Sequence, residues 1–297
     1  MREIEYRLCD VFTETRLAGN QLAVFLDGGA LTGTQMQALA KETNLSETTF
    51  ICRREAAVEA ERGVRVRIFT TQEELPFAGH PTLGTAATIR ETCAEYAHAE
   101  TVRLDLNAGI VPVRFSPERS TGASVFGEMT QPEPVFGAYH QSAQLAAILG
   151  LAVEDLHPEW KPQTVSTGMP FCIVPLRSVE ALGRLSLHAR EADDYLRSTD
   201  AKFIYAIAPG EEGTWRARMQ FYNGEDPATG SAAGCATAWL VAHDLAASDN
   251  VVHLRQGIEM GRPSGIYGRA KLSDGRVSEV RIAGSTVSVA KGRFFLE

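Results

Sequence analysis

The stretch RIFTTQEELPFAGH, residues 67–80, can be aligned without a gap with RMQFYNGEDPATGS, residues 218–231. Both stretches begin at Arg in a strand-like run and end in the pattern Glu-x-Pro-x-x-Gly followed by His or Ser. Each leads into a run of small residues, at 81–90 and at 232–242, which predicts a helix. The repeat indicates two halves of one design, so we expect the functional site where the halves meet.

The length and a change of composition predict where the halves divide. A chain of 297 residues is long enough for two domains, each with its own core. Between residues 116 and 134 the sequence is rich in Ser, Pro, Gly and Glu, as linkers are. We therefore expect an N-terminal half of residues 1–118 plus 284–297, a C-terminal half of residues 119–283, and an active site in the cleft between them.

Most of the chain is predicted to be antiparallel strand. Val64, Val66 and Ile68 alternate with Arg65 and Arg67, which is typical of a strand with one buried face. Helices are expected from residue 34, over 81–90, over 142–150 and over 231–242. Further strands are expected at residues 4–12, 21–26, 48–52, 102–106, 110–115, 171–176, 203–208 and 215–221, and in the tail at 277–282, 286–290 and 292–296.

The second repeat helix is unusual because it carries no charge. Residues 231–242 (SAAGCATAWLVA) are apolar or small on every face, and a helix of this kind is enclosed by other elements. Its Ala, Gly, Ser and Thr content lets neighbouring backbones come close. The simplest architecture is an α+β fold of two pseudo-symmetric halves, each a strand barrel around a central helix. The alternative is an α+β sandwich with its helices on one face.

Charge and hydropathy argue against several kinds of partner. The net charge is -8, and Lys and Arg do not cluster as they would on a nucleic-acid surface. No apolar run approaches the roughly 18 residues that a membrane span needs. The N-terminal sequence MREIEYRLCD is charged and lacks the apolar core of a signal peptide, so we expect a cytoplasmic protein that binds neither nucleic acid nor membrane.

The cysteines and histidines point away from disulfides and metals. The five cysteines are scattered and never form a Cys-x-x-Cys pair, which fits reduced, mostly buried thiols; they are Cys9, Cys52, Cys93, Cys172 and Cys235. The seven histidines have no ligand spacing, so no metal site is expected.

The start of each repeat helix is a candidate binding site. Gly79-His80 and Gly230-Ser231 stand there, where unpaired N–H groups and the positive end of the helix dipole attract an anion. Neither loop has the lysine or the spacing of a nucleotide-binding loop, so a small carboxylate is the better candidate. Alternatively, His80 and Ser231 are only N-caps.

Two carboxylates are candidate acid/base groups. Asp226 stands four residues before Gly230, where a loop would direct it at the helix start, and Glu47 lies in the polar segment NLSETTF between a helix and a strand. A carboxylate in a partly dry site can exchange protons near neutral pH. The alternative is that both are surface acids or caps. Glu74 and Glu225 share a repeat position, and their symmetry suggests a structural role.

Four segments, DVFTETRLAGNQLAVF, LSETTF, ELPFAGHPTLGTA and NGEDPATGSAAG, closely resemble the phenazine-biosynthesis isomerase (PhzF-like) family. The resemblance runs in order along nearly the whole chain. It implies a diaminopimelate epimerase-like fold, with two similar halves, each a strand barrel around a central helix. The active site would lie between the halves.

The resemblance also implies a cofactor-free isomerase that forms a homodimer. The best-known member converts trans-2,3-dihydro-3-hydroxyanthranilate to its keto tautomer by moving a proton around the ring. By this resemblance Glu47 would shuttle the proton, His80 and Asp226 would contact the substrate and assist, and Gly79, Gly230 and Ser231 would line the pocket and bind the carboxylate. Epimerases of this fold use two thiols instead, and here no Cys stands at either helix start.

Three functions remain open from the sequence. The first is an isomerase that shifts a proton on a dihydroaromatic amino acid. The second is a racemase, epimerase or isomerase of another small acid that uses the same acid pair. The third is a metabolite-binding protein that retains the fold without turnover. The asymmetry of the repeat favours an isomerase, since His80 matches Ser231 and Leu75 matches Asp226.

Overall fold

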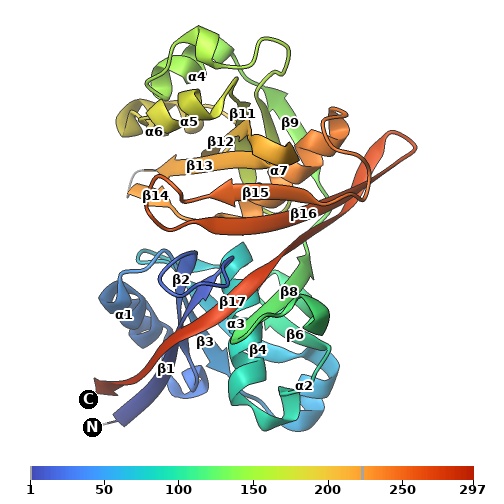
Figure 1. The fold of residues 1–297 in the computed structure, drawn as a ribbon. Helices are drawn as coiled ribbons and strands as arrows, with labels where there is room; N and C mark the ends of the chain where they lie inside the picture. Colours follow the sequence, from blue (N-terminus) through green and yellow to red (C-terminus); the bar gives the residue numbers. More distant parts are fainter. Residues whose placement is uncertain (1, 222–223) are drawn as a thin grey trace. The chain divides into compact units, whose positions relative to one another are not determined.

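The computed structural model describes residues 2–221 and 224–297, and the chain divides into two compact units. Unit 1 comprises Met1–Thr130 and Ala283–Glu297, and unit 2 comprises Gln131–Ile282. Strand β17 (Arg276–Leu296) begins in unit 2 and continues into unit 1 (Figure 1). Within the second motif, Tyr222 and Asn223 lie outside the described residues.

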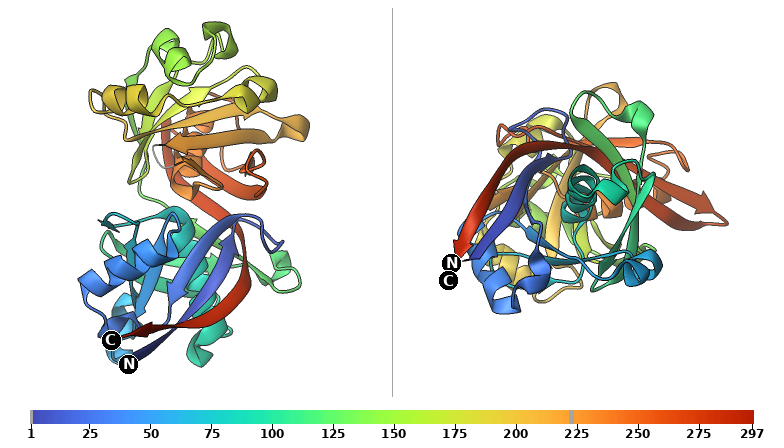
Figure 2. Two further views of the ribbon diagram at one scale, coloured as in Figure 1. Left: turned by 90° about the vertical axis from the view of Figure 1, so that its left-hand side faces the viewer. Right: turned by 90° about the horizontal axis from the view of Figure 1, so that it is seen from below.

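Unit 1 is a curled sheet with one helix, α3 (Gly79–Thr92), on its inner side. In the right-hand view of Figure 2, α3 is seen with the strands of unit 1 around it. The strands are β1 (Arg2–Val11), β2 (Asn20–Phe25), β3 (Thr48–Cys52), β4 (Val64–Phe69), β5 (Glu74–Leu75), β6 (Thr101–Leu106), β7 (Gly109–Phe115), β8 (Ser124–Thr130) and the last part of β17. Two further helices are α1 (Gly33–Thr43) and α2 (Ala56–Arg62).

Unit 2 repeats this arrangement around helix α7 (Gly230–Ala242). Its strands are β9 (Val135–Tyr139), β10 (Gln163–Ser166), β11 (Pro170–Pro175), β12 (Phe203–Pro209), β13 (Trp215–Phe221), β14 (Gly224–Asp226), β15 (Val252–Gln256), β16 (Ser264–Ser273) and the first part of β17. Three helices, α4 (Ser142–Ile148), α5 (Val179–Arg184) and α6 (Ala189–Leu196), pack with β11 and β12 in one apolar cluster.

The strand pairings show that the two units are the same structure twice. In unit 1, β2 is parallel to β3, β3 is antiparallel to β4, and β4 is parallel to β6. The same three pairings join β11, β12, β13 and β15 in unit 2. Even the register agrees, because Ile68 pairs with Leu75 as Met219 pairs with Asp226. The predicted α+β fold of two pseudo-symmetric halves, each with strands around a central helix, is confirmed.

Both central helices are enclosed, as their composition predicts. Residues 79–89 of α3 and 230–241 of α7 are all buried. A Cβ on Gly84 would lie 2.6 Å from Cδ2 of Leu22, and a Cβ on Gly234 would lie 1.8 Å from Oε1 of Gln131. Small residues are therefore required where neighbouring side chains press against these helices. For α3 and α7 the alternative of helices on one sheet face is wrong.

Strand β3 lies between two helices, α3 on one face and α1 on the other. Thr49 faces the central helix, where its hydroxyl lies 2.8 Å from that of Thr85. Phe50 faces the other way and packs with Met36 and Leu39 of α1. Successive residues of a strand point to opposite faces, so β3 is buried on both. The strand thereby holds the residue before it, Glu47, between α1 and α3.

The division between units and the tail both differ in detail from what composition suggests. The predicted division was after residue 118, whereas β8 pairs with β7 and belongs to unit 1. The tail was expected to form three strands, but residues 276–296 form one continuous strand. The first part of this strand pairs with β16 of unit 2, and its last part pairs with β1 of unit 1. In the described part of the chain, no helix is long and apolar enough to cross a membrane.

Candidate active site

Glu47 is positioned by the tight connection between α1 and β3. Helix α1 ends at Thr43 and is capped by Asn44, whose backbone is left-handed with φ of 50° and whose N–H donates to the Ala40 carbonyl. The hydroxyls of Thr43 and Thr48 lie 2.8 Å apart and close the loop on either side of Glu47. The Glu47 side chain is 18% exposed, so its carboxylate is held in a mostly dry position with access to a ligand.

His80 is the second residue of α3 and lies beside Glu47. The N-cap position of α3 is occupied by Ala78, whose side chain forms no capping hydrogen bond. The alternative that His80 is an N-cap is therefore wrong. Nδ1 of His80 lies 3.3 Å from Nδ2 of Asn20 and 3.7 Å from Oε2 of Glu47. Nε2 is buried and has no hydrogen-bond partner among the described residues. His80 is therefore held on one ring nitrogen and keeps the other for a ligand.

The imidazole of His80 is neutral at physiological pH. Burial lowers its pKa to about 3, because the charged form would lose its hydration. The 3.7 Å approach to Glu47 is consequently not an ion pair, and it is also too long for a hydrogen bond. A neutral imidazole can donate or accept one hydrogen bond at Nε2 according to its tautomer.

In unit 2, Asp226 lies at the start of the central helix, as predicted. It ends β14, is 8% exposed, and its Oδ2 accepts a 2.6 Å hydrogen bond from the hydroxyl of Thr229. Thr229 is the N-cap of α7, so Ser231 is not the cap, and Gly230 and Ser231 form the buried first turn. The carboxylate and the first N–H groups of α7 thus lie in one place.

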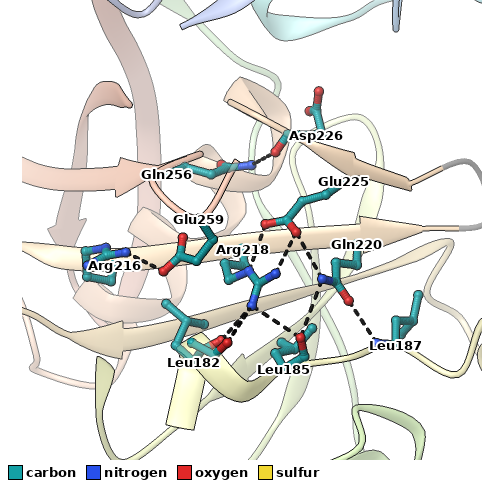
Figure 3. A network of polar contacts seen from close by, with 11 residues as sticks. Leu182, Leu185, Leu187, Arg216, Arg218, Gln220, Glu225, Asp226, Gln256 and Glu259 are labelled. Carbon is teal, nitrogen blue, oxygen red and sulfur yellow. Dashed lines mark hydrogen bonds and ion pairs between the residues drawn. The ribbon is translucent and has the colours of Figure 1, made fainter. Parts of the chain in front are cut away.

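One buried side chain holds both ends of the loop that carries Asp226. Gln256 of β15 is fully buried, and its Nε2 donates to the Asp226 carbonyl at 2.7 Å and to the Thr229 hydroxyl at 3.0 Å. Its Oε1 accepts from the Tyr205 hydroxyl at 2.9 Å and from the Thr229 N–H at 3.1 Å. Figure 3 shows Gln256 on the backbone of Asp226, while the Asp226 carboxylate points away from the contact.

The paired residues Glu74 and Glu225 have structural partners in their own units. Arg67 binds Glu74 through two hydrogen bonds of 2.7 and 2.6 Å, and Arg218 binds Glu225 through two of 2.8 and 2.6 Å. Arg218 also donates to carbonyls at the end of α5, including that of Leu185, so the pair fastens α5 to the sheet (Figure 3). Their predicted structural role agrees with these contacts.

The two halves can be compared residue by residue through the shared register. The acid of unit 2 and the polar residues around it have apolar or smaller counterparts in unit 1. Asp226 corresponds to Leu75, and Thr229, Gln256 and Tyr205 correspond to Ala78, Leu106 and Thr49. The scaffold therefore forms without these polar groups. By the same register Glu47 corresponds to Phe203, His80 to Ser231 and Asn20 to Met169. Each unit has its own chemistry on a common frame.

Sequence reasoning missed three of these residues. Asn20 lies in a motif that the family resemblance quotes, but its contact with His80 depends on how β2 lies beside α3. Thr229 and Gln256 become informative only when each is compared with its counterpart in the other half, Ala78 and Leu106. Extending the repeat alignment beyond residue 80 is the signal that would have found Gln256.

The buried thiols are poor bases. Burial raises the pKa of Cys9 to about 12 and that of Cys235 to about 11, so both remain protonated near neutral pH. Cys235 lies inside α7, beyond its first turn, with its sulfur 3.4 Å from the Thr167 hydroxyl. A pair of thiols at the two helix starts is therefore not the chemistry of this chain.

Comparison with known proteins agrees with this architecture. The family model of phenazine biosynthesis-like proteins, PhzC-PhzF, matches residues 9–292. The chain belongs to this family. A trans-2,3-dihydro-3-hydroxyanthranilate isomerase of Pseudomonas aeruginosa is 37% identical over 294 residues, which cover 98% of this chain and 99% of that protein.

Solved structures extend the comparison to the fold. A predicted epimerase from Pseudomonas aeruginosa superposes with a TM-score of 0.84 at 33% identity, covering 99% of this chain and 100% of that one. A probable proline racemase from Agrobacterium radiobacter shares the fold at 13% identity, with a TM-score of 0.63 and coverage of 99% and 93%. Family members that resemble this chain are named as isomerases, and the chain is an isomerase.

Proposed function

We propose that this enzyme shifts a proton on a small carboxylate-bearing substrate without a cofactor, as the name of its relative, trans-2,3-dihydro-3-hydroxyanthranilate isomerase, suggests. The observation that carries the proposal is the chemical asymmetry of the two units. Glu47 lies beside a neutral histidine in unit 1, and the equivalent place in unit 2 has Phe203 and Ser231. When a proton moves between two different carbons of a substrate, the enzyme has to offer different surroundings to the two carbons.

In the proposed reaction Glu47 is the general base and then the general acid. Its carboxylate accepts a proton from a C–H bond, whose electrons move into the conjugated system of the substrate. The carboxylic acid formed on Glu47 returns a proton to another carbon, so the product is an isomer and no atoms are gained or lost. Such acid/base catalysis typically contributes about 10² to 10⁴ in rate.

The other site residues bind and orient the substrate in this proposal. His80, being neutral, uses Nε2 to form a hydrogen bond to a polar substituent of the substrate. Gly79, Gly230 and Ser231 supply helix-start N–H groups for the substrate carboxylate. Asp226 interacts with the substrate amine or hydroxyl. The hydrogen bond from the Thr229 hydroxyl holds its Oδ2 in place.

The test is exchange of a substrate proton in deuterated water. We expect NMR to detect deuterium in the product when trans-2,3-dihydro-3-hydroxyanthranilate is supplied. Glu47→Gln should lower the rate about 100-fold or more with an unchanged fold, because the amide cannot accept the proton. Glu42→Gln, which removes an exposed carboxylate of α1, is the matched control and should keep wild-type turnover.

Other outcomes separate the remaining possibilities. Wild-type turnover by Glu47→Gln would remove Glu47 from the mechanism. Exchange on another small acid in a substrate panel, with none on the dihydroaromatic amino acid, would change the substrate but keep the reaction type. Binding that raises the melting temperature without exchange on any substrate would indicate a metabolite-binding protein.

We also propose that the enzyme is a homodimer of the cytoplasm. The family resemblance supports the dimer, and five unpaired cysteines support a reducing compartment. Light scattering of the purified protein should give twice the mass of the 297-residue chain. The mass of one chain at micromolar concentration would contradict the dimer.

A further inference from the structure

Unit 1 contains a cavity that the isomerase reaction does not use. It has a volume of about 770 Å³ and is lined by residues of β1, the end of α3, the segment 117–125 and β17. This is within the usual size range of small-molecule sites. His80 is at the opposite end of α3 from the two α3 residues that line the cavity, Arg90 and Glu91.

The charged side chains of this cavity are nearly all cations. Arg7, Arg16, Arg90 and Lys291 line it, together with one acid, Glu91. The whole chain carries 29 Lys and Arg against 37 Asp and Glu, so a local excess of three positive charges opposes the general balance. The potential inside the cavity is therefore positive in an otherwise acidic protein.

Two of the cations stand directly opposite each other on neighbouring strands. Arg7 of β1 pairs in register with Lys291 of β17, and like charges in this position are destabilising. Arg7 has only a weak contact with an acid, at 3.9 Å from Oε2 of Glu5. The side-chain ammonium of Lys291 has neither an ion pair nor a hydrogen bond to any described residue. An anion between the two would remove the repulsion.

The two remaining cations are oriented by neutral groups. Arg90 lies over the ring of Phe115, 4.8 Å from its centre, and its Nε is buried without a hydrogen-bond partner among the described residues. Arg16 is fastened by its Nε to the Ser288 carbonyl at 2.8 Å, and no other contact of its guanidinium group is found in the described part of the chain. Neither guanidinium group forms an ion pair with a carboxylate of the described residues.

From these four observations we infer that the cavity binds a small anion with two or more negative charges, carried on phosphate or carboxylate groups. Arginine forks recognise both groups through paired hydrogen bonds. The inference is independent of the isomerase mechanism, because none of the lining residues belongs to the candidate active site.

Calorimetric titration tests this site with two probes, tripolyphosphate and citrate, at constant ionic strength, and with acetate as a singly charged comparison. We expect saturable binding of one multivalent anion per chain and none of acetate in the same range. Whichever of the two probes binds more tightly identifies the group, phosphate or carboxylate. Absence of saturable binding by both would overturn the inference.

Matched variants locate the binding. The double variant Arg90→Gln/Lys291→Gln should raise the dissociation constant at least about tenfold, because half of the cations are removed. Lys41→Gln with Arg190→Gln removes two exposed cations elsewhere and should leave it within about twofold. Glu91→Gln should tighten binding about two- to fivefold, since it removes the one acid.

Two results would contradict the assignment. Equal weakening by both double variants would mean general charge attraction. Unchanged binding by the Arg90 and Lys291 variant would mean that the anion binds elsewhere, for example where the substrate carboxylate is proposed to bind. If that double variant does not fold, as judged by circular dichroism, the tightening expected of Glu91→Gln tests the same site, and an unchanged affinity there would count against it.

Discussion

His80 is a residue whose burial couples the candidate site to stability. The pKa of its imidazole is about 3 in the folded chain, against 6.5 for an exposed histidine. Between these values the unfolded chain binds a proton that the folded chain does not. Its contribution to stability is therefore complete above pH 6.5 and is lost as the pH falls.

We expect this loss to be measurable in urea titrations at pH 7 and pH 5. Over this interval the free energy of unfolding should fall by about 2 kcal/mol on account of His80. In His80→Gln this part of the decrease should be absent, while His98→Gln, which changes an exposed histidine, should behave as the wild type. Equal pH dependence of the wild type and His80→Gln would show that the imidazole is charged in the folded protein.

The site could be predicted from the sequence only as far as its motifs reach. Glu47, His80 and Asp226 stand in segments with a family pattern, and the structure places the first two together in unit 1. Gln256 is thirty residues from Asp226 in a strand with no motif, and only the pairing of β13 with β15 brings it to the loop. Sequence patterns report local geometry, whereas such a contact depends on tertiary pairing.

At the scale of elements, the loop between β14 and α7 is where hydrogen bonds act on a candidate catalytic group. Thr229→Ala removes the hydroxyl that donates to Asp226 Oδ2 and accepts from Gln256 Nε2, and it should lower kcat/KM at neutral pH about tenfold because the carboxylate is no longer held in place. Thr229→Ser keeps a hydroxyl and should restore kcat/KM. Equal kcat/KM in all three proteins would show that this hydrogen bond does not position the acid.

The central helices owe their position to residues without side chains. Gly234→Ala places a Cβ 1.8 Å from Oε1 of Gln131, which is itself fixed by a 2.6 Å hydrogen bond from Thr167. We expect a loss of about 1–3 kcal/mol in the free energy of unfolding from this overpacking. Gly183→Ala in α5 meets no atom within 4 Å and should be neutral or stabilising by up to about 1 kcal/mol. Chemical denaturation measures the free energy of unfolding of both variants. An equal change in the two would contradict close packing at Gly234.

Elements with a strong local pattern were predictable and those defined by their partners were not. Strand β4, with its alternating Arg and Val, and helix α7, without charge, were expected where they occur. Strand β8 lies in a segment whose Ser, Pro and Gly content indicates a linker, and it is a strand because β7 pairs with it. Helix α2 is short and mostly exposed, so it has no apolar stripe to recognise.

At the scale of the whole molecule, unit 1 depends on both ends of the chain. Strand β1 pairs with β2 on one side and with the last part of β17 on the other, from Arg2 opposite Leu296 to Val11 opposite Thr286. Deleting residues 283–297 should remove hydrogen-exchange protection from β1 and α3 but leave it in β12 and α7, since unit 2 is one continuous segment.

Mass spectrometry of exchanged peptides resolves the two units. Deletion of Glu297 alone, which lies outside β17, is the control and should leave protection unchanged. Retained protection of β1 in the longer deletion would mean that unit 1 does not need this strand. Loss of protection in both units would mean that they unfold as one.

The path of β17 also bears on how the protein is made. The ribosome releases the N-terminal segment first, yet unit 1 lacks its closing strand until residues 283–297 emerge, whereas residues 131–282 of unit 2 are available earlier. Unit 1 is therefore synthesised first but completed last, whereas domains usually fold in order from the N-terminus. Until residues 286–296 emerge, β1 has an unpaired edge, which is a template for association with other nascent chains. Emergence of residues 283–297 is then the event that closes the unit synthesised first and covers this edge.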